Sequence, residues 1–200
     1  MQALLALSNG IDAVSKKFGQ VADYLVLICS LICAGNAIVR YLFSMSSNGW
    51  LEIQWYMFGA MVLLGASYTL KMNEHVRVDL IYGAVAAKTR LWIDIIGITL
   101  FLLPVSILFS VLCWPFFFSS ITSCFTERTG SGAYDTLAAL WSSACEQSSN
   151  AGGLIRWPVK LMLVLGFLLL ALQGVSELIK RIAALKGAME VDTSYEKPLQ

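Results

Sequence analysis

The amino-acid sequence predicts an all-α membrane protein that forms one membrane domain over residues 1–200. Its composition is 58% hydrophobic and only 14% charged, with a mean hydropathy of +0.70, whereas a soluble domain is usually about 45–50% apolar and about 25% charged. Four stretches are apolar over the roughly 20 residues that a helix needs to cross a bilayer. The net charge is +1, so the chain has no basic field that would indicate a nucleic-acid partner. We expect membrane lipids around it instead.

Residues 1–20 are predicted to form a short amphipathic helix that lies along the membrane surface. Five apolar residues recur there at the three- and four-residue spacing of one helix face, namely Leu4, Leu7, Ile11, Val14 and Phe18. A signal peptide is not indicated, because the apolar run breaks at residues 8–10 and the lysines follow it. The alternative for this segment is a frayed tail.

The four predicted transmembrane helices are residues 21–44, 50–70, 91–118 and 157–179. Every backbone polar group in hydrocarbon must be paired, so each stretch is expected to be helical. The third is longer than a bilayer requires, which predicts a tilt or a bend near Pro104. Pro158 fits the first turn of the fourth helix, where its missing N–H would lack a partner in any case.

Lys and Arg are unequally divided between the segments that connect these helices. Most of the 14 lie in the N-terminal segment, the loop 71–90 and the tail 180–200. The others are Arg40, Arg128, Arg156 and Lys160. Cytoplasmic segments carry the excess of Lys and Arg, so both termini are predicted to be cytoplasmic and the long loop 119–156 to face outward.

Glu52 is the most informative charge near a predicted span. It lies about half a turn into the second span, where an unpaired carboxylate would be costly. Three cations are predicted at the same level, namely Arg40, Arg156 and Lys160. We expect Glu52 to face one of them, either as a brace within the chain or as a contact with another subunit. Elsewhere, the i,i+4 spacing predicts pairs between Arg90 and Asp94 and between Glu177 and Arg181.

The loop sequence KMNEHVRVDLIYG, residues 71–83, holds the only histidine, His75. A zinc site needs three or four protein ligands, and no cysteine lies near this histidine. The sequence therefore predicts a loop or helix-end histidine that bonds a neighbour. We expect no metal, no cofactor and no catalytic residue here.

Two of the five cysteines, Cys124 and Cys145, fall in the predicted outward loop. An oxidising compartment favours a disulfide between them. Closing a loop of this size would contribute roughly 3 kcal/mol in the chain-entropy account. Cys29, Cys33 and Cys113 lie in or near predicted spans and are expected to be small apolar filler.

From about residue 20 to residue 185 the chain resembles the small, DctQ-like membrane subunit of tripartite ATP-independent periplasmic (TRAP) transporters. The resemblance rests on four features: Trp50 and Glu52, LLGASYTLK across Gly65 and Ala66, EHVRVDLIY with His75 and Asp79, and EQSSNAGGLIRWPVK at residues 146–160. The chain departs from the family in two ways. Ile53 and Gln54 follow Glu52 where many members carry two adjacent acids, and the 119–145 loop is longer than usual.

The resemblance implies a non-catalytic subunit in a bacterial inner membrane. Its partners would be a periplasmic solute-binding protein, which usually delivers a carboxylate, and a large membrane subunit. The large subunit would hold the sodium and substrate sites and move its transport domain like an elevator, while the small one packs against its scaffold. His75 and Asp79 would then shape the cytoplasmic loop. The candidate contact or structural residues are Arg40, Trp50, Glu52, Arg156, Trp157 and Lys160.

Two other functions stay open at this point. One is a four-helix membrane thiol oxidoreductase that uses a quinone, and the other is an accessory subunit of a different membrane complex. The enzyme would need two outward-facing cysteine pairs. The chain has no C-x-x-C, and its short outer loop SMSSNG has no cysteine, so the transporter subunit is favoured.

Overall fold

The computed structural model describes residues 2–45, 47–74, 85–125, 139–141, 145–150 and 152–187. Its helices are α1 (Gln2–Phe43), α2 (Asn48–Met72), α4 (Ala87–Gly97), the π-helical turn η1 (Ile98–Leu102), α5 (Leu103–Ser123) and α7 (Trp157–Leu185). Within these ranges the only β-type pairing is a single antiparallel bridge between Gln147 and Ile155. The described chain is therefore all-α, as predicted.

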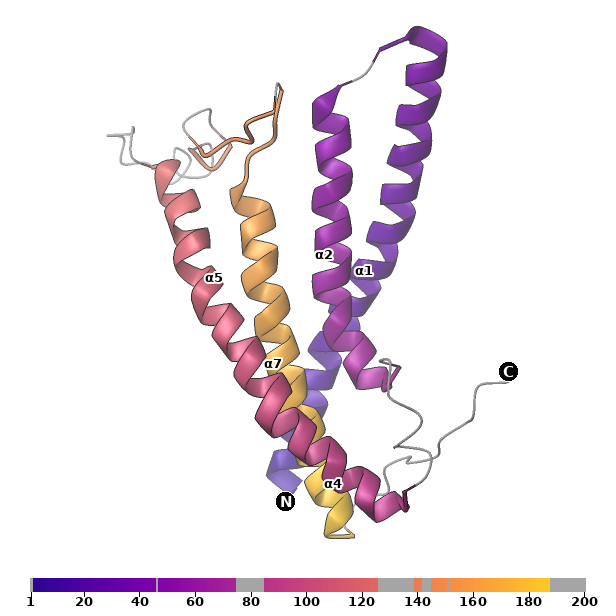
Figure 1. Ribbon diagram of the computed structural model, residues 1–200, viewed down its shortest axis with the longest axis vertical. Helices are drawn as coiled ribbons and strands as arrows, with labels where there is room; N and C mark the ends of the chain where they lie inside the picture. The colour runs from indigo at the N-terminus through magenta and orange to yellow at the C-terminus, as the bar shows by residue number, and fades with distance from the viewer. Residues whose placement is uncertain are drawn as a thin grey trace.

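The helices form an elongated bundle in which α7 is the shared element (Figure 1). α1 and α2 form an antiparallel hairpin, while α4, η1 and α5 continue one another as a single rod. α7 packs against α1, α2, α4 and α5. The beginning of α1, the end of α2, the beginning of α4 and the end of α7 gather at one end of the molecule (Figure 1). Both ends of the described chain therefore lie on the same side of the bundle.

Three helices are long and apolar enough to cross a membrane: Gln2–Phe43, Lys88–Ser123 and Trp157–Leu185. They contain the first, third and fourth predicted spans. α2 has 25 residues and is also long enough, but Glu52 and Gln54 make its head less apolar. The second span is therefore shown as a helix, whereas its passage through the membrane stays a prediction.

The N-terminal segment differs from the prediction. Residues 2–43 are one continuous helix of 42 residues, so residues 2–20 are neither a separate surface helix nor a frayed tail. The buried positions of α1 are small residues, namely Ser8, Ser15, Gly19 and Ala22, whereas Leu4 and Leu7 are exposed. The prediction was wrong because it assumed that the polar face of this helix lies in water, whereas the polar residues of that face are bonded to α7.

The third predicted span contains the irregularity expected near Pro104. The π-helical turn Ile98–Leu102 directly precedes α5, and Pro104 stands in the first turn of α5. A proline ring clashes with the preceding helical turn and donates no hydrogen bond, and a π-turn is one way for a helix to absorb such a break. Gly174 of α7 leaves room for this turn, because an added Cβ there would lie 2.5 Å from Leu102 Cδ2.

Glycines also set the distance between the other packed helices. An added Cβ at Gly166 of α7 would lie 2.6 Å from Leu63 Cβ and 3.1 Å from the Leu63 carbonyl oxygen. An added Cβ at Gly19 of α1 would lie 2.5 Å from Cγ of Tyr68. Small residues let membrane helices approach closely. Here α1 and α7 supply the glycines, and α2 supplies the larger side chains that pack against them.

Candidate functional site

A buried row of polar side chains joins the first half of α1 to the last turns of α7. We call it the polar seam, and its members are Ser8, Asp12 and Ser15 of α1, Asp94 of α4, and Gln173, Ser176, Glu177, Lys180 and Arg181 of α7. Gln173 and Ser176 are fully buried, and the Arg181 side chain is only 4% exposed. Buried polar groups are costly without partners, so the seam is defined by how its members satisfy one another.

Hydrogen bonds connect α1 and α7 along the seam. The hydroxyls of Ser8 and Ser176 are 2.7 Å apart. Ser15 donates its hydroxyl to Gln173 Oε1 at 2.7 Å, and Gln173 Nε2 donates to Asp12 Oδ1 at 3.0 Å. The Ser176 hydroxyl also donates to Asp12 Oδ1, at 2.8 Å. Both sides of the Gln173 amide are thus used, and the polar stripe of α1 is held by residues far away in the sequence.

Ion pairs complete the seam. Lys180 Nζ lies 2.6 Å from Asp12 Oδ2 and 2.9 Å from Glu177 Oε1. Arg181 pairs with Glu177, which confirms the predicted i,i+4 contact. Its Nε atom also lies 3.0 Å from Asp94 Oδ2, which ties α7 to α4. Each charge of the seam therefore has an opposite charge beside it, and three helices are fixed to one another.

This arrangement holds helices together and offers little for chemistry. The carboxylates of the seam are engaged by lysine, arginine, serine and glutamine side chains of the same seam. Among the described residues, no three His, Cys, Asp or Glu side chains converge on a position that could hold a metal ion. His75 and Asp79 lie outside the described residues, so their predicted role in shaping the loop stays a prediction.

A second polar group lies at the opposite end of α7. We call it the loop clasp, and its members are Glu52, Glu146, Leu154, Arg156 and Lys160. Glu52 Oε2 accepts a hydrogen bond from the Leu154 backbone N–H at 2.7 Å. Glu146 pairs with Lys160 at 2.5 Å and with Arg156 at 3.5 Å. Among the described residues Glu52 forms no ion pair with the expected cations, because Glu146 pairs with both Arg156 and Lys160; a contact between Glu52 and another subunit stays a prediction.

Glu146 is positioned by backbone contacts on both sides. Its N–H donates to the Ser123 hydroxyl at 3.1 Å, and its carbonyl accepts from the Arg156 N–H at 2.9 Å. The hydrogen bond from Lys160 holds the pKa of Glu146 below its ordinary value. Lys160 Nζ also lies 3.9 Å from the centre of the Phe116 ring. The clasp thus neutralises a buried lysine at the first turn of α7.

Covalent and aromatic contacts fix the same loop to α5 and α7. Cys124, at the end of α5, is joined to Cys145 with the two sulfurs 2.06 Å apart. Trp157 Nε1 donates to the Leu140 carbonyl at 2.9 Å, and its ring meets Trp141 edge to face with 5.9 Å between centroids. The described parts of loop 119–156 are therefore anchored at several points.

The other predicted residues are not gathered into one site. Arg40 is exposed on the last turn of α1, and Trp50 is exposed on the first turn of α2. Sequence reasoning missed Asp12, Gln173 and Glu146. Gln173 had a signal, because a polar residue inside the apolar run LLLALQGVSELI is unusual in a span. Glu146 had none, since its loop carries no periodic pattern.

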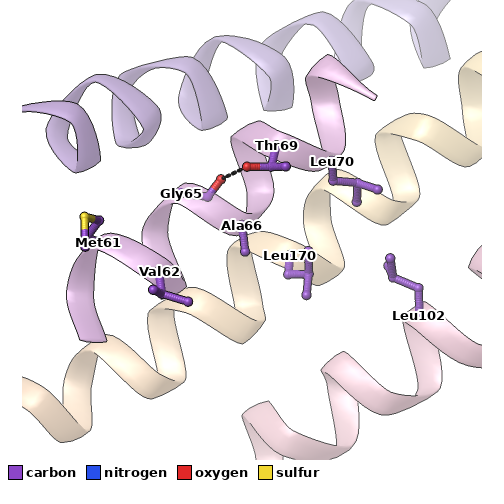
Figure 2. Close-up of a pocket in the computed structure, with 8 residues that line it drawn as sticks. All are labelled: Met61, Val62, Gly65, Ala66, Thr69, Leu70, Leu102 and Leu170. Atoms are coloured by element: carbon purple, nitrogen blue, oxygen red, sulfur yellow. Dashed lines mark hydrogen bonds between the residues drawn. The ribbon is translucent and has the colours of Figure 1, made fainter. Parts of the chain in front are cut away.

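An apolar groove opens between α2, η1 and α7 (Figure 2). Its volume is about 470 Å³, and it is lined by Met61, Val62, Gly65, Ala66, Thr69, Leu70, Leu102 and Leu170. The small side of α2, at Gly65 and Ala66, forms part of this lining. Thr69 donates its hydroxyl to the Gly65 carbonyl at 3.2 Å. The Thr69 hydroxyl is therefore already bonded within α2, and the groove offers a neighbouring helix an apolar surface.

Comparison with known proteins identifies one family. The family described as "Tripartite ATP-independent periplasmic transporters, DctQ component" matches residues 28–184. The C4-dicarboxylate TRAP transporter small permease protein DctQ of Vibrio cholerae serotype O1 is 32% identical over 93 residues. This alignment covers 46% of the present chain and 40% of that relative. No solved structure matches the chain.

Proposed function

We propose that this chain, which belongs to the DctQ family of TRAP transporter components, stabilises the scaffold of a large membrane subunit. The match over residues 28–184 is the observation that carries the proposal, because it runs from the middle of α1 through α2, α4 and α5 to the last turn of α7. The chain is a small permease component and not an enzyme, so the oxidoreductase alternative is wrong.

The proposed transporter has three kinds of component. The large membrane subunit would bind sodium and solute and move its transport domain like an elevator, and a periplasmic solute-binding protein would deliver the solute. The relative from Vibrio cholerae is named for C4-dicarboxylates, which supports a carboxylate as the solute class. Sodium coupling and the elevator motion follow from the resemblance alone.

The proposed topology has four transmembrane helices with both termini in the cytoplasm of the inner membrane. The fold supports this, because the beginning of α1 and the end of α7 lie at the same end of the bundle (Figure 1). The cations Lys16, Lys88 and Lys186 belong to the helix ends gathered there. The excess of Lys and Arg marks the cytoplasmic side.

The groove at Gly65 and Ala66 is the proposed contact with the large subunit. Helix association in lipid depends on close van der Waals packing, which small residues permit. α2 is also the one long described helix that does not count as apolar enough to cross a membrane by its composition, and a helix of that kind gains most from protein contact in place of lipid. We therefore assign this face of α2, with Leu102 and Leu170 beside it, to the scaffold of the partner.

Co-purification tests the proposal. The full-length chain is co-expressed with a large TRAP membrane subunit from the same organism and captured through an affinity tag in mild detergent. We expect the large subunit to be recovered with the wild-type chain and about tenfold less of it with Ala66→Leu, because the added side chain fills the groove.

Gly10→Leu is the matched control, since an added Cβ at Gly10 meets nothing within 4 Å and Gly10 is not among the residues that line the groove. Equal recovery of the large subunit with both variants would reject this face of α2. Absence of any membrane partner from the wild-type preparation would reject the proposed function itself.

A further inference from the structure

A second groove separates α1 from α2 near the link that joins them. Its volume is about 530 Å³, and it is lined by Ile28, Leu31, Ile32, Gly35, Asn36, Val39, Met45, Ser47 and Trp50. The two helices spread apart toward this link (Figure 1), so the groove is a wedge between two helices of a membrane protein. An apolar wedge at this depth has to be filled by something other than water.

Two polar side chains mark the same wedge. Asn36 lies in its wall and makes no hydrogen bond within the described part of the chain. Arg40 is exposed one helical turn further along α1 and forms no ion pair with any described residue. An amide without a partner is costly in hydrocarbon, and a cation at the end of a span seeks an anion at the membrane surface.

We propose that this wedge binds one anionic phospholipid. Its acyl chain lies between α1 and α2, its phosphate pairs with Arg40, and its glycerol ester region accepts a hydrogen bond from Asn36. Residues four apart on a helix are separated by about 6 Å along the axis, which is similar to the span between a lipid's phosphate and its ester carbonyls.

The chemistry of the lining favours a lipid over a second protein helix. The groove is apolar except for the amide of Asn36 and the hydroxyl of Ser47, and both residues lie closer along the chain to the link between α1 and α2 than Ile28 and Leu31 do. A phospholipid has the same order of groups, because its apolar chain is followed by esters and then by a charged phosphate. Trp50, in the first turn of α2, is part of the same lining, and amphipathic rings of this kind prefer the membrane interface.

Native mass spectrometry of the full-length chain in mild detergent tests the proposal. Dioleoylphosphatidylglycerol and dioleoylphosphatidylcholine are added in separate titrations. We expect wild-type protein to retain one phosphatidylglycerol at about tenfold lower concentration than phosphatidylcholine, because the phosphate pairs with Arg40 while no choline group shields it. Arg40→Gln removes this preference, and Arg40→Lys retains most of it.

Two further variants separate this site from general lipid contact. Asn36→Leu should weaken retention of both lipids, since both carry glycerol esters. Lys88→Gln removes an exposed cation at the other end of the bundle and should leave the preference unchanged. If Arg40→Gln retains phosphatidylglycerol as the wild type does, the lipid is an annular one only and the proposal is wrong.

Fluorescence locates the bound lipid. Phosphatidylglycerol brominated on the acyl carbons nearest its glycerol esters is titrated into the wild-type chain and into Trp50→Phe, both in phosphatidylcholine nanodiscs. We expect the quenching at low phosphatidylglycerol content to fall in Trp50→Phe, because bromine quenches only tryptophans that it touches. Identical quenching curves would place the lipid elsewhere and overturn the proposal.

Discussion

At the scale of single residues, Gln173 is the centre of the polar seam. Its amide accepts a hydrogen bond from Ser15 and donates to Asp12 and, at 3.3 Å, to Glu177. A buried amide whose donor and acceptor atoms are both engaged fixes the rotation of the two helices about their axes. A buried amide with only some of its hydrogen bonds would destabilise the fold relative to an apolar side chain at the same position. The seam thus determines which side of α1 faces α7.

Asp12→Asn should destabilise the bundle. The change removes the negative charge that faces Lys180 at 2.6 Å. Because Glu177 still pairs with that ammonium and the pair is only partly buried, the cost should stay below the about 3–5 kcal/mol of a buried charge left without a partner. The measurement is the thermal unfolding midpoint of the full-length chain in mild detergent, which should fall by several degrees.

Asp23→Asn is the control for this change, since Asp23 is an exposed residue of the same helix and its substitution should shift the midpoint little. Equal midpoints for the two variants would mean that the seam contributes nothing to stability.

The residues of the two polar groups differ in how far the sequence could predict them. The pair between Glu177 and Arg181 was predictable, because residues four apart share a helix face. The bonds from Ser8 and Ser15 to α7 span 168 and 158 positions, and no local pattern reports such distances. Glu52 was recognised as needing a partner, but the sequence did not show that a backbone N–H would supply it.

At the scale of the helices, local patterns located elements better than they located buried faces. The predicted spans 50–70 and 157–179 became α2 at Asn48–Met72 and α7 at Trp157–Leu185. Hydrophobic periodicity identified a helix in residues 1–20 as well, but it gave the wrong environment to its polar side. The sequence pattern of a polar helix face is the same whether that face contacts water or another helix.

Gly166→Ala should loosen the contact between α7 and α2. The new methyl group would collide with Leu63, including its backbone carbonyl, and overpacking of this kind costs about 1–3 kcal/mol. Denaturant unfolding of the full-length chain in mixed micelles, followed by circular dichroism, gives the change in free energy of unfolding.

Gly35→Ala serves as the comparison, since nothing lies within 4 Å of an added Cβ there. It should be neutral or slightly stabilising, because alanine is the better helix former. The packing argument would be contradicted if Gly166→Ala proved as stable as Gly35→Ala.

At the scale of the whole molecule, the two ends of α7 are secured by different means. One end is buried in the polar seam, whereas the other is held by the loop clasp and by the link between Cys124 and Cys145. The loop therefore closes the gap between the end of α5 and the beginning of α7. This connection holds the end of α5 beside the beginning of α7.

Thiol counting checks the covalent part of this description. Unreduced, denatured protein treated with a maleimide should gain three labels, at Cys29, Cys33 and Cys113, which are free in the structure. Reduction before labelling should raise the count to five. Five labels without reduction would show that the loop cysteines are thiols, and the roughly 3 kcal/mol that closing this loop contributes in the chain-entropy account would not apply.

The contact between α1 and α7 has a consequence for biosynthesis. The N-terminal half of α1 leaves the ribosome first, but the residues that satisfy Ser8, Asp12 and Ser15 are among the last of the described chain to be made. Until then these groups can form hydrogen bonds only with water, lipid head groups or the insertion machinery. Packing of the first helix is therefore completed by the last, and a chain that stops before α7 is left with a strip of polar side chains on α1 that lack these partners.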